Sequence, residues 1–367
     1  MRIFYDHPIF TIQIYGGVSR YFHEIIPRIA AMRDSRVSVF MGLHLNRFGL
    51  ERHRDRFAHF AGLRLPAMSK AHRFIRAADD IAADWFTAAH DFDVFHSTYF
   101  RTRPTSPARV RITTVHDLMQ ERIPESFGLP RSQCEWIRKF TLAFDGLICV
   151  SHNTARDVMH YWKVPRHKIA VVHHGNSLHG LRSGERIVER PYLLYVGMRH
   201  EYKGFRRLLE TYARLPGVRD SFDLVCTGAG AFNAAEMDQI ERLGLAQRVR
   251  FVRGGDDRRL VTLYSHAAAL VYPSLYEGFG IPILEAFGCG CPVVSSDRSS
   301  LPEVGGDAAL YFDPEQPDDM AAKLSRILED QALRTRLIRA GREREKQFTW
   351  ESAARQTREF YQRILEG

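Results

Sequence analysis

The amino-acid sequence predicts an α/β protein built from two Rossmann-like domains that face each other across a cleft. Short apolar runs alternate with helical patterns along the chain, which is typical of parallel βαβ units. The 367 residues are enough for two domains of ordinary size. Residues 177–190 show little periodicity and indicate a linker, so the domains are predicted at 1–176 and 191–348.

The first domain is predicted to contain six strands, each followed by a polar or glycine-containing loop. They are Arg2–Tyr5, Val37–Gly42, Asp93–His96, Arg111–Val115, Gly146–Val150 and Ile169–His173. Apolar residues at helical spacing predict a helix from about Ser19 to Met32, and Ser151 is expected to cap another. Residues 43–90 are harder to assign to helices or strands.

The second domain shows the same alternation. The predicted strands are Tyr192–Val196, Asp223–Thr227, Val249–Val252, Ala267–Tyr272, Val293–Val294 and Ala309–Phe312. The predicted helices are Ala231–Leu243, Asp256–His266, Pro282–Phe287, Asp318–Glu329, Asp330–Phe348 and Trp350–Leu365. The last of these belongs to a C-terminal segment, residues 349–367, that follows the second domain.

The stretch from Tyr272 to Asp297 has the pattern of a binding site for an anionic, hydroxyl-rich ligand. A helix that starts near Pro282 directs free N–H groups and a partial positive charge toward the preceding loop. Glu277 and Glu285 bracket that start and can accept hydrogen bonds from sugar hydroxyls. The alternative is a plain loop with two solvated acids, but the neighbours of Glu285 are nearly all apolar, which makes an unpartnered carboxylate costly.

Three other segments follow strands or begin helices, at the places where ligands bind in α/β proteins. Arg199 and Lys203 flank the loop after one strand, so two cations can converge on a diphosphate, although loop cations are often merely solvated. Gly17 lies at a helix start, where a glycine pair either approaches a phosphate or makes a tight turn. His116 follows a strand directly, whereas His96 is expected to be structural or to support the site indirectly.

The motifs around these positions resemble those of the retaining GT-B glycosyltransferases of family GT4. The segment EGFGIPILE resembles the family's E-x7-E signature, and CPVVSSDRSSLPEVGGDAALYFDP resembles its continuation. The loop with Arg199 and Lys203 is similar to the family pattern VGxRxxxKG, and TTVHDL resembles the segment that carries the site histidine. The resemblance spans nearly the whole chain and is weakest over residues 43–90.

This resemblance implies a role for each candidate residue. Arg199 and Lys203 would hold the diphosphate, Glu285 the ribose, and Glu277 the transferred sugar. The base would pack near Val252 or Arg253. His116 would lie near the reacting carbon. The remaining nucleotide-sugar contacts would come from Gly17, Gly278, Phe279, Gly280 and Ile281.

The resemblance further implies a reaction and its partners. A nucleotide sugar would be the donor to the second domain, and a glycan or lipid-linked glycan the acceptor on the first. Transfer would retain the anomeric configuration and need neither a metal nor another cofactor. GDP-mannose is the first expectation and UDP-sugars the alternative, because SSDRSSLPEV and YGGVSRYF resemble bacterial mannosyl- or rhamnosyltransferases of polysaccharide assembly. The final helix is expected to cross back to the first domain.

Charge is distributed unevenly along the chain. Residues 1–180 hold 25 Lys and Arg against 16 Asp and Glu, whereas the remaining residues hold 27 of each. Basic residues mix with phenylalanines between Arg47 and Arg76, which suits an anionic membrane surface or, alternatively, a solvated helical face with aromatics in the core. The basic residues of that run are Arg47, Arg52, Arg54, Arg56, Arg64, Lys70, Arg73 and Arg76.

Several classes of protein fit less well. No apolar run reaches the length of a membrane span and no signal-peptide pattern opens the sequence, so a cytoplasmic location is expected, with peripheral contact to the inner face of the cell membrane. The five cysteines and 17 histidines show no zinc-ligand spacing. The paired VGxRxxxKG and E-x7-E motifs argue against a UDP-sugar 2-epimerase. The sequence shows no aromatic stacking motifs of the kind that nucleic-acid-binding proteins use, so no nucleic acid is expected.

Overall fold

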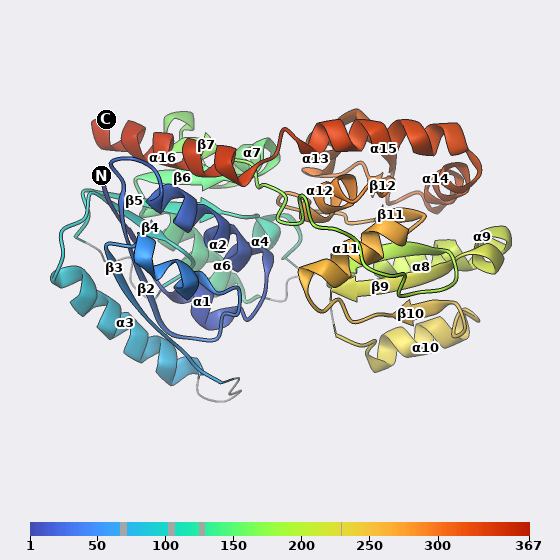
Figure 1. Ribbon diagram of the computed structural model, residues 1–367, viewed down its shortest axis with the longest axis horizontal. Helices are drawn as coiled ribbons and strands as arrows, with labels where there is room; N and C mark the ends of the chain where they lie inside the picture. Colours follow the sequence, from blue (N-terminus) through green and yellow to red (C-terminus); the bar gives the residue numbers. More distant parts are fainter. Residues whose placement is uncertain (67–71, 102–106, 125–128, 229) are drawn as a thin grey trace. The chain divides into compact units, whose positions relative to one another are not determined.

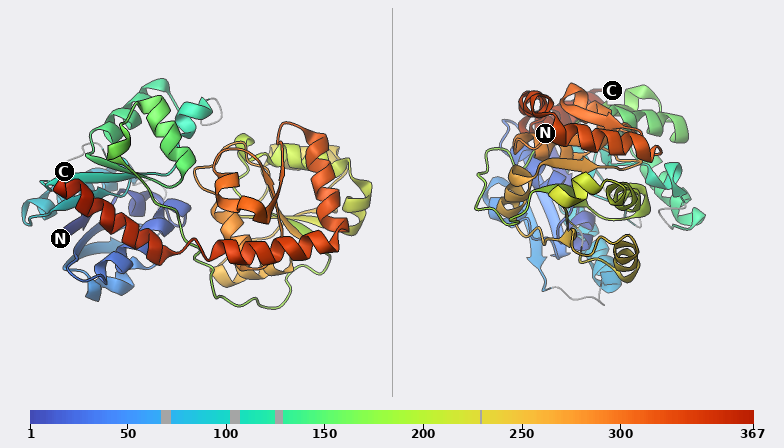
Figure 2. Two further views of the ribbon diagram at one scale, coloured as in Figure 1. Left: turned by 90° about the horizontal axis from the view of Figure 1, so that it is seen from above. Right: turned by 90° about the vertical axis from the view of Figure 1, so that its right-hand side faces the viewer.

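The computed structural model describes residues 1–66, 72–101, 107–124, 129–228 and 230–367 (Figure 1). These residues form two compact units. Unit 1 comprises Met1–Arg122, Gly128–Gly175 and Trp350–Gly367, and unit 2 comprises Asn176–Thr349 with the short segment Ile123–Phe127. Both chain ends therefore belong to unit 1, as the two views of Figure 2 show.

Unit 1 contains a parallel sheet of seven strands in the order β3-β2-β1-β4-β5-β6-β7. The strands are β1 (Arg2–Tyr5), β2 (Arg36–His44), β3 (His59–Arg64), β4 (Val94–Ser97), β5 (Val110–Val115), β6 (Gly146–Cys149) and β7 (Ile169–Val171). Ile3 is in register with Val37 of β2 on one side and Val94 of β4 on the other. The strand order reverses between β1 and β4, which is where open parallel sheets bind ligands.

Helices cover both faces of this sheet. They are α1 (Pro8–Ile12), α2 (Gly17–Ala30), α3 (His72–Ala88), α4 (Met119–Arg122), α6 (Arg131–Leu142), α7 (His152–Trp162) and α16 (Trp350–Glu366), with short 3-10 turns η1 (Leu50–Arg56) and η2 (Arg166–Lys168). Side chains alternate along β1, so Ile3 and Tyr5 pack with α2 and α16, while Phe4 packs with α3, α6 and α7. The C-terminal helix α16 lies against α2 and so completes the core of unit 1 (Figure 1).

Unit 2 contains a parallel sheet of six strands in the order β10-β9-β8-β11-β12-β13. The strands are β8 (Tyr192–Gly197), β9 (Asp223–Gly228), β10 (Val249–Phe251), β11 (Ala269–Tyr272), β12 (Val293–Ser296) and β13 (Ala309–Phe312). Here the order reverses between β8 and β11. Both units are therefore Rossmann-like, as the sequence predicts.

The helices of unit 2 pack against this sheet or against one another. They are α8 (Phe205–Ala213), α9 (Pro216–Ser221), α10 (Ala234–Arg242), α11 (Asp257–His266), α12 (Ile281–Gly288), α13 (Leu301–Gly305), α14 (Pro317–Glu329) and α15 (Gln331–Glu345), with turns η3 (Glu201–Lys203) and η4 (Gly306–Ala308). Side chains of α8, α10 and α14 form one core with β8, β9 and β11. Helix α12 packs on α15 and α11.

Every strand predicted from the sequence occurs in the structure, with ends shifted by a few residues. The region 43–90, in which no helix or strand was predicted, contains the edge strand β3 and helix α3. Phe57 is buried and Phe60 packs against the same core, so these two phenylalanines of the basic run face inward. Lys70 lies outside the described residues. Within the described ranges, no helix combines the length and apolar character that a membrane span requires.

Candidate functional site

The candidate site of unit 2 lies where the strand order reverses. Strands β8 and β11 are neighbours, and the loops after them carry Lys203 and Glu277. The Nζ atom of Lys203 donates to both carboxylate oxygens of Glu277, at 2.7 and 2.8 Å. Both side chains are largely buried, with 16% and 11% of their surface exposed. A cation and a carboxylate thus meet at the position that binds ligands in this class of sheet.

A close backbone approach holds the two loops together. Gly204 has φ +71, and a side chain there would place its Cβ 2.3 Å from the carbonyl oxygen of Pro273. The N–H of Leu275 donates to the carbonyl of Tyr202 at 2.7 Å. Glycine is therefore required at position 204 by both its φ angle and the approach of the second loop.

Two serines fix the backbone of the Glu277 loop. The hydroxyl of Ser300 donates to the carbonyl oxygens of Glu277 and Phe279, at 2.8 and 2.7 Å. Ser299, which has φ +60, donates to the same Glu277 carbonyl and accepts from the Glu277 N–H at 3.2 Å. No role was predicted for these serines, although they lie in the segment after β12 whose pattern resembles the family continuation.

Helix α12 begins as the sequence predicts, one residue before Pro282. Gly280 precedes the helix with φ +115, a conformation that other residues rarely adopt. Phe279 is buried against Phe348, so only its backbone is available to a ligand. Gly278 and Ile281 complete the turn that aims the first N–H groups of the helix.

Glu285 is buried in α12 and has a partner within unit 2. The hydroxyl of Tyr264, on α11, donates to Oε2 of Glu285 at 2.8 Å. Burial, and secondarily the nearby Glu285 carboxylate, raises the pKa of the Tyr264 phenol well above its ordinary value. The tyrosine therefore stays a donor and fixes the carboxylate.

Arg199 has different partners from Lys203. Its Nε donates to Glu236 at 2.8 Å, and its Nη2 donates to the carbonyls of Gly230 and Ala231, at 2.8 and 2.9 Å. Its guanidinium lies 4.9 Å from the ring centre of Phe232, and 5% of the side chain is exposed. Arg199 thus fixes the start of α10 rather than pairing with the Glu277 loop. Among the described residues, its buried Nη1 has no hydrogen-bond partner.

The carboxyl ends of β9 and β10 form the outer part of the site. Val252 is half-buried and its N–H donates to Cys226, while the Arg253 side chain is exposed. The Thr227 hydroxyl lies close to Gly254. A Cβ added to this glycine would be 3.1 Å from the hydroxyl oxygen. That hydroxyl is buried and lacks a hydrogen-bond partner within the described part of the chain. Nothing in the sequence distinguishes Thr227 beyond its position at a strand end.

Unit 1 contains the predicted positions Gly17 and His116. Gly17 is exposed at the first position of α2, and Ser19 anchors this start by donating to the Gly16 carbonyl at 3.1 Å. His116 directly follows β5 and packs edge-to-face on Tyr21 at 5.3 Å. Its Nε2 is buried with no hydrogen-bond partner among the described residues. Burial lowers the pKa of His116 to about 3, so its imidazole is neutral at pH 7.

The rings around His116 connect it to the C-terminal helix. His174 stacks on His116 at 5.8 Å and meets Trp350 of α16 edge-to-face at 5.5 Å. His96 is fully buried, with Nε2 at 2.9 Å from the Thr114 hydroxyl and Nδ1 against the Tyr361 hydroxyl of α16. These contacts agree with the expectation that His96 is structural.

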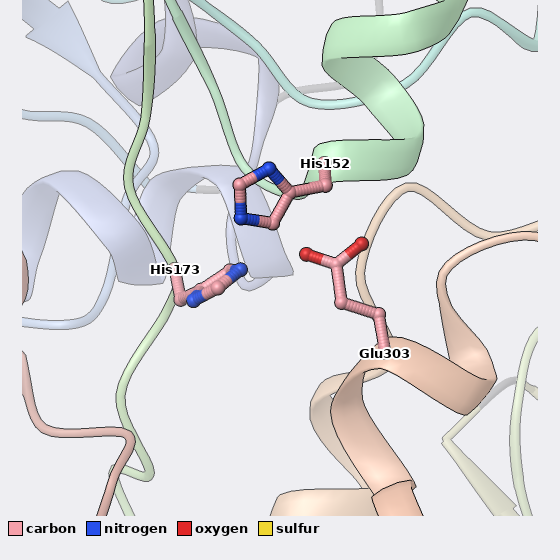
Figure 3. Close-up of side chains that lie close together, drawn as sticks. All are labelled: His152, His173 and Glu303. Atoms are coloured by element: carbon pink, nitrogen blue, oxygen red, sulfur yellow. The ribbon is translucent and has the colours of Figure 1, made fainter.

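A second histidine pair of unit 1 lies near the end of the sheet. Figure 3 labels His152, the first residue of α7, and His173, which follows β7, and their rings meet edge-to-face at 5.7 Å. Glu303, also labelled there, belongs to α13 of unit 2. Protein zinc sites use three or four side-chain ligands, so the two histidines of unit 1 alone do not define one.

Comparison with solved structures identifies the fold class. Sucrose-phosphate synthase from Thermosynechococcus elongatus matches with a TM-score of 0.78 and 20% identity, over 100% of this chain and 99% of that chain. Two Rossmann-like units of this kind define the GT-B class of fold. Residues 15–179 match the family "Glycosyltransferase Family 4", and residues 181–344 match "Glycosyl transferases group 1". The chain belongs to glycosyltransferase family 4.

Two curated relatives are similar over part of their length. O-antigen chain mannosyltransferase B of Escherichia coli is 39% identical over 45% of this chain and 44% of the relative. MMP alpha-(1->4)-mannosyltransferase of Mycolicibacterium hassiacum is 31% identical over 60% of this chain and 54% of the relative. The chain thus spans about half the length of the curated relatives it matches.

Proposed function

We propose that this protein is a hexosyltransferase that moves a sugar from a nucleotide diphosphate sugar to a glycan or lipid-linked glycan in surface polysaccharide assembly. The observation that carries the proposal is the Lys203–Glu277 pair at the strand-order reversal of unit 2. A phosphate group can replace the Glu277 carboxylate as the partner of Lys203. The released carboxylate can then accept a hydrogen bond from a sugar hydroxyl.

In this proposal the donor occupies unit 2. Lys203 and the N-terminal N–H groups of α12 neutralise the leaving diphosphate, which is electrostatic stabilisation of developing charge. Arg199 contributes through its Nη1, the one nitrogen of its guanidinium without a partner among the described residues. Glu285, fixed by Tyr264, accepts from the ribose, and the base lies near Val252 and Arg253.

The reaction exchanges one bond at the anomeric carbon. The bond between that carbon and the donor phosphate oxygen breaks, and the carbon bonds to the acceptor oxygen on the same face. The acceptor proton passes to the departing phosphate, so configuration is retained and the nucleoside diphosphate leaves. His116, neutral at pH 7, lies beside the sugar with the amides around Gly17. Because Lys203 supplies positive charge, we propose that turnover needs no metal ion.

GDP-mannose is the proposed donor and a UDP-sugar the alternative. Both curated relatives described above carry mannosyltransferase in their names, and one is named for the O-antigen chain, which supports a mannosyl donor and a role in lipopolysaccharide biosynthesis. The acceptor is proposed to bind unit 1, whose excess of basic residues suits a lipid phosphate and peripheral contact with the inner face of the cell membrane.

A donor screen tests this function directly. The full chain is mixed with GDP-mannose, UDP-glucose, dTDP-rhamnose or ADP-glucose, and its melting temperature is measured with and without EDTA. GDP-mannose is expected to raise the melting temperature most and equally in EDTA. A larger shift with UDP-glucose would reassign the donor, and a shift with none of the four would refute the proposal. Proton NMR of the glycoside formed then reports whether the anomeric configuration is retained.

A further inference from the structure

Helix α3 exposes an apolar stripe on the surface of unit 1. Trp85 and Ile81 are 77% and 62% exposed. The exposed residues that share this side of the helix are alanines: Ala77, Ala78, Ala82, Ala88 and Ala89, with the exposed Asp84 at the edge of the stripe. At 100° per residue the seven positions occupy about 140° of the helix circumference without a polar side chain. An amphipathic helix normally buries such a stripe, whereas α3 presents it to solvent.

The acidic residues of α3 lie beside or behind this stripe and are held by partners inside unit 1. Asp79 accepts from the Leu43 N–H at 2.9 Å. Asp80 and Asp84 both accept from the buried Arg101, at 2.9 and 3.0 Å. These bonds fix the rotation of the helix and draw its carboxylates away from the outer stripe.

A basic pocket continues the stripe at the C-terminal end of α3. It has a volume of about 260 Å³, and Ala89 lies in its wall together with Arg2, Arg36, His59 and His90. Arg36 is exposed and is the cation that a phosphate can reach, whereas Arg2 is paired with Asp91, which also lines the pocket, at 3.6 Å and with Asp93 at 3.4 Å. The edge strand β3 adds Leu63, which is 62% exposed and shares the face of His59 that contacts α3.

We propose that α3 and this pocket form a docking surface for an anionic lipid bilayer. Trp85 and Ile81 enter the interfacial region, and lipid phosphates approach Arg36. An apolar helix stripe next to basic groups, with a tryptophan at its centre, is the pattern of helices that lie in a membrane surface. The formal charge of +9 carried by residues 1–180 attracts the protein to such a surface.

A second copy of the chain fits this surface less well. A helix of 17 residues is about 25 Å long, so a stripe about 10 Å wide offers on the order of 250 Å², against about 800 Å² per partner in a stable interface. Two such surfaces also bring together two units of like charge, which disfavours self-association.

The experiment measures flotation of the full chain with vesicles of phosphatidylcholine alone or with 30% phosphatidylglycerol. We expect binding only to the anionic vesicles, reduced at least tenfold in the double variant Ile81→Ala/Trp85→Ala. Arg36→Glu is expected to reduce binding about threefold. Trp136→Ala removes the next most exposed tryptophan, which lies on α6, and is expected to bind as the wild type does. An unchanged circular-dichroism spectrum and melting temperature in the double variant check that it is folded.

Two results would overturn the proposal. The first is equal flotation of the wild type and the double variant, or no flotation of either with anionic vesicles. The second is a wild-type dimer in light scattering that the double variant converts to a monomer without any change in flotation, which would assign the stripe to a second copy. Neither readout involves sugar transfer, so the docking surface and the proposed activity can fail separately.

Discussion

The two units share an architecture but differ in what lies at the carboxyl ends of their strands. In unit 2 these ends carry a charged pair, Lys203 and Glu277, with serines that fix the surrounding backbone. In unit 1 the corresponding region around His116 is a cluster of aromatic rings and histidines whose pKa values are lowered by burial. Unit 2 thus offers an ion pair in which an anionic ligand can replace the carboxylate. Unit 1 instead keeps its imidazoles neutral.

This difference assigns separate tasks to the two units. A salt bridge between largely buried groups can be opened by a polyanion that replaces the carboxylate, and so it suits a diphosphate. Neutral rings cannot hold a diphosphate, but they can form an apolar wall, which is the role proposed for the region around His116. Substitutions in unit 2 should therefore act on the donor, through its affinity or its departing diphosphate, whereas substitutions around His116 should change turnover with little effect on donor affinity.

Lys203→Met should have the largest effect. Loss of the ammonium removes the charge that opposes the leaving diphosphate, so kcat is expected to fall about 10³-fold, the upper range for loss of one preorganised donor. The variant also leaves Glu277 largely buried without its cation, which should lower the melting temperature. Activity is measured with saturating GDP-mannose, and stability by thermal unfolding.

A double variant separates these two effects. Lys203→Met/Glu277→Gln removes both charges and should recover most of the lost stability, because no unpaired carboxylate remains. It should stay as inactive as the single variant. Recovered activity in the double variant would mean that Lys203 only neutralises Glu277 and does not serve the diphosphate.

His116→Ala should have the next largest effect, in the other unit. We expect kcat to fall about 10²-fold, since one group that contacts the transition state is lost. Affinity for GDP-mannose should change less than twofold. His152→Ala, which removes an exposed histidine of the same unit, serves as the control and should leave both constants unchanged. A fall in donor affinity without loss of kcat would place His116 in nucleotide binding instead.

Glu285→Gln should weaken donor binding about tenfold, or 1.4 kcal/mol, because the ribose loses a charged acceptor. The matched control is Tyr264→Phe, which removes the internal hydrogen bond but keeps the carboxylate. The control should lower stability more than affinity. Calorimetric titration with GDP measures both variants, and equal affinities for Glu285→Gln and wild type would leave Glu285 with a purely structural role.

Short-range patterns predicted every strand except β3, the loops that carry Lys203 and Glu277, and the start of α12, because such patterns determine strands, glycine turns and helix starts. They could not predict partners that come from distant segments. The pairing of Arg199 with Glu236 depends on how α10 packs beside the loop after β8, and the serine contacts to Glu277 cross 22 or 23 positions. Helix α3 was not predicted, although its sequence is amphipathic at helical spacing.

Acidification should produce the smallest effect and should act mainly on unit 1. His96 and His116 have their pKa lowered to about 3 by burial, and the pKa of His174 is also lowered. The unfolded chain therefore binds more protons than the folded unit between about pH 6.5 and 3, so stability falls as pH decreases through that range. Asp6 and Asp79 oppose this trend, because burial raises the pKa of each carboxyl group to about 6. They are two groups against three histidines, and their pKa shifts are smaller than those of His96 and His116.

Tryptophan fluorescence can follow this effect in unit 1 alone. All four tryptophans, Trp85, Trp136, Trp162 and Trp350, belong to that unit. Urea unfolding monitored by tryptophan should therefore shift to lower midpoints between pH 6.5 and 4.5, and His96→Gln should flatten the dependence. The shifted groups described in unit 2 are tyrosines and cysteines with raised pKa, which titrate at alkaline pH. A midpoint that rises on acidification would show that the two carboxyl groups outweigh the histidines, and that the ring cluster around His116 is not the acid-sensitive part of the fold.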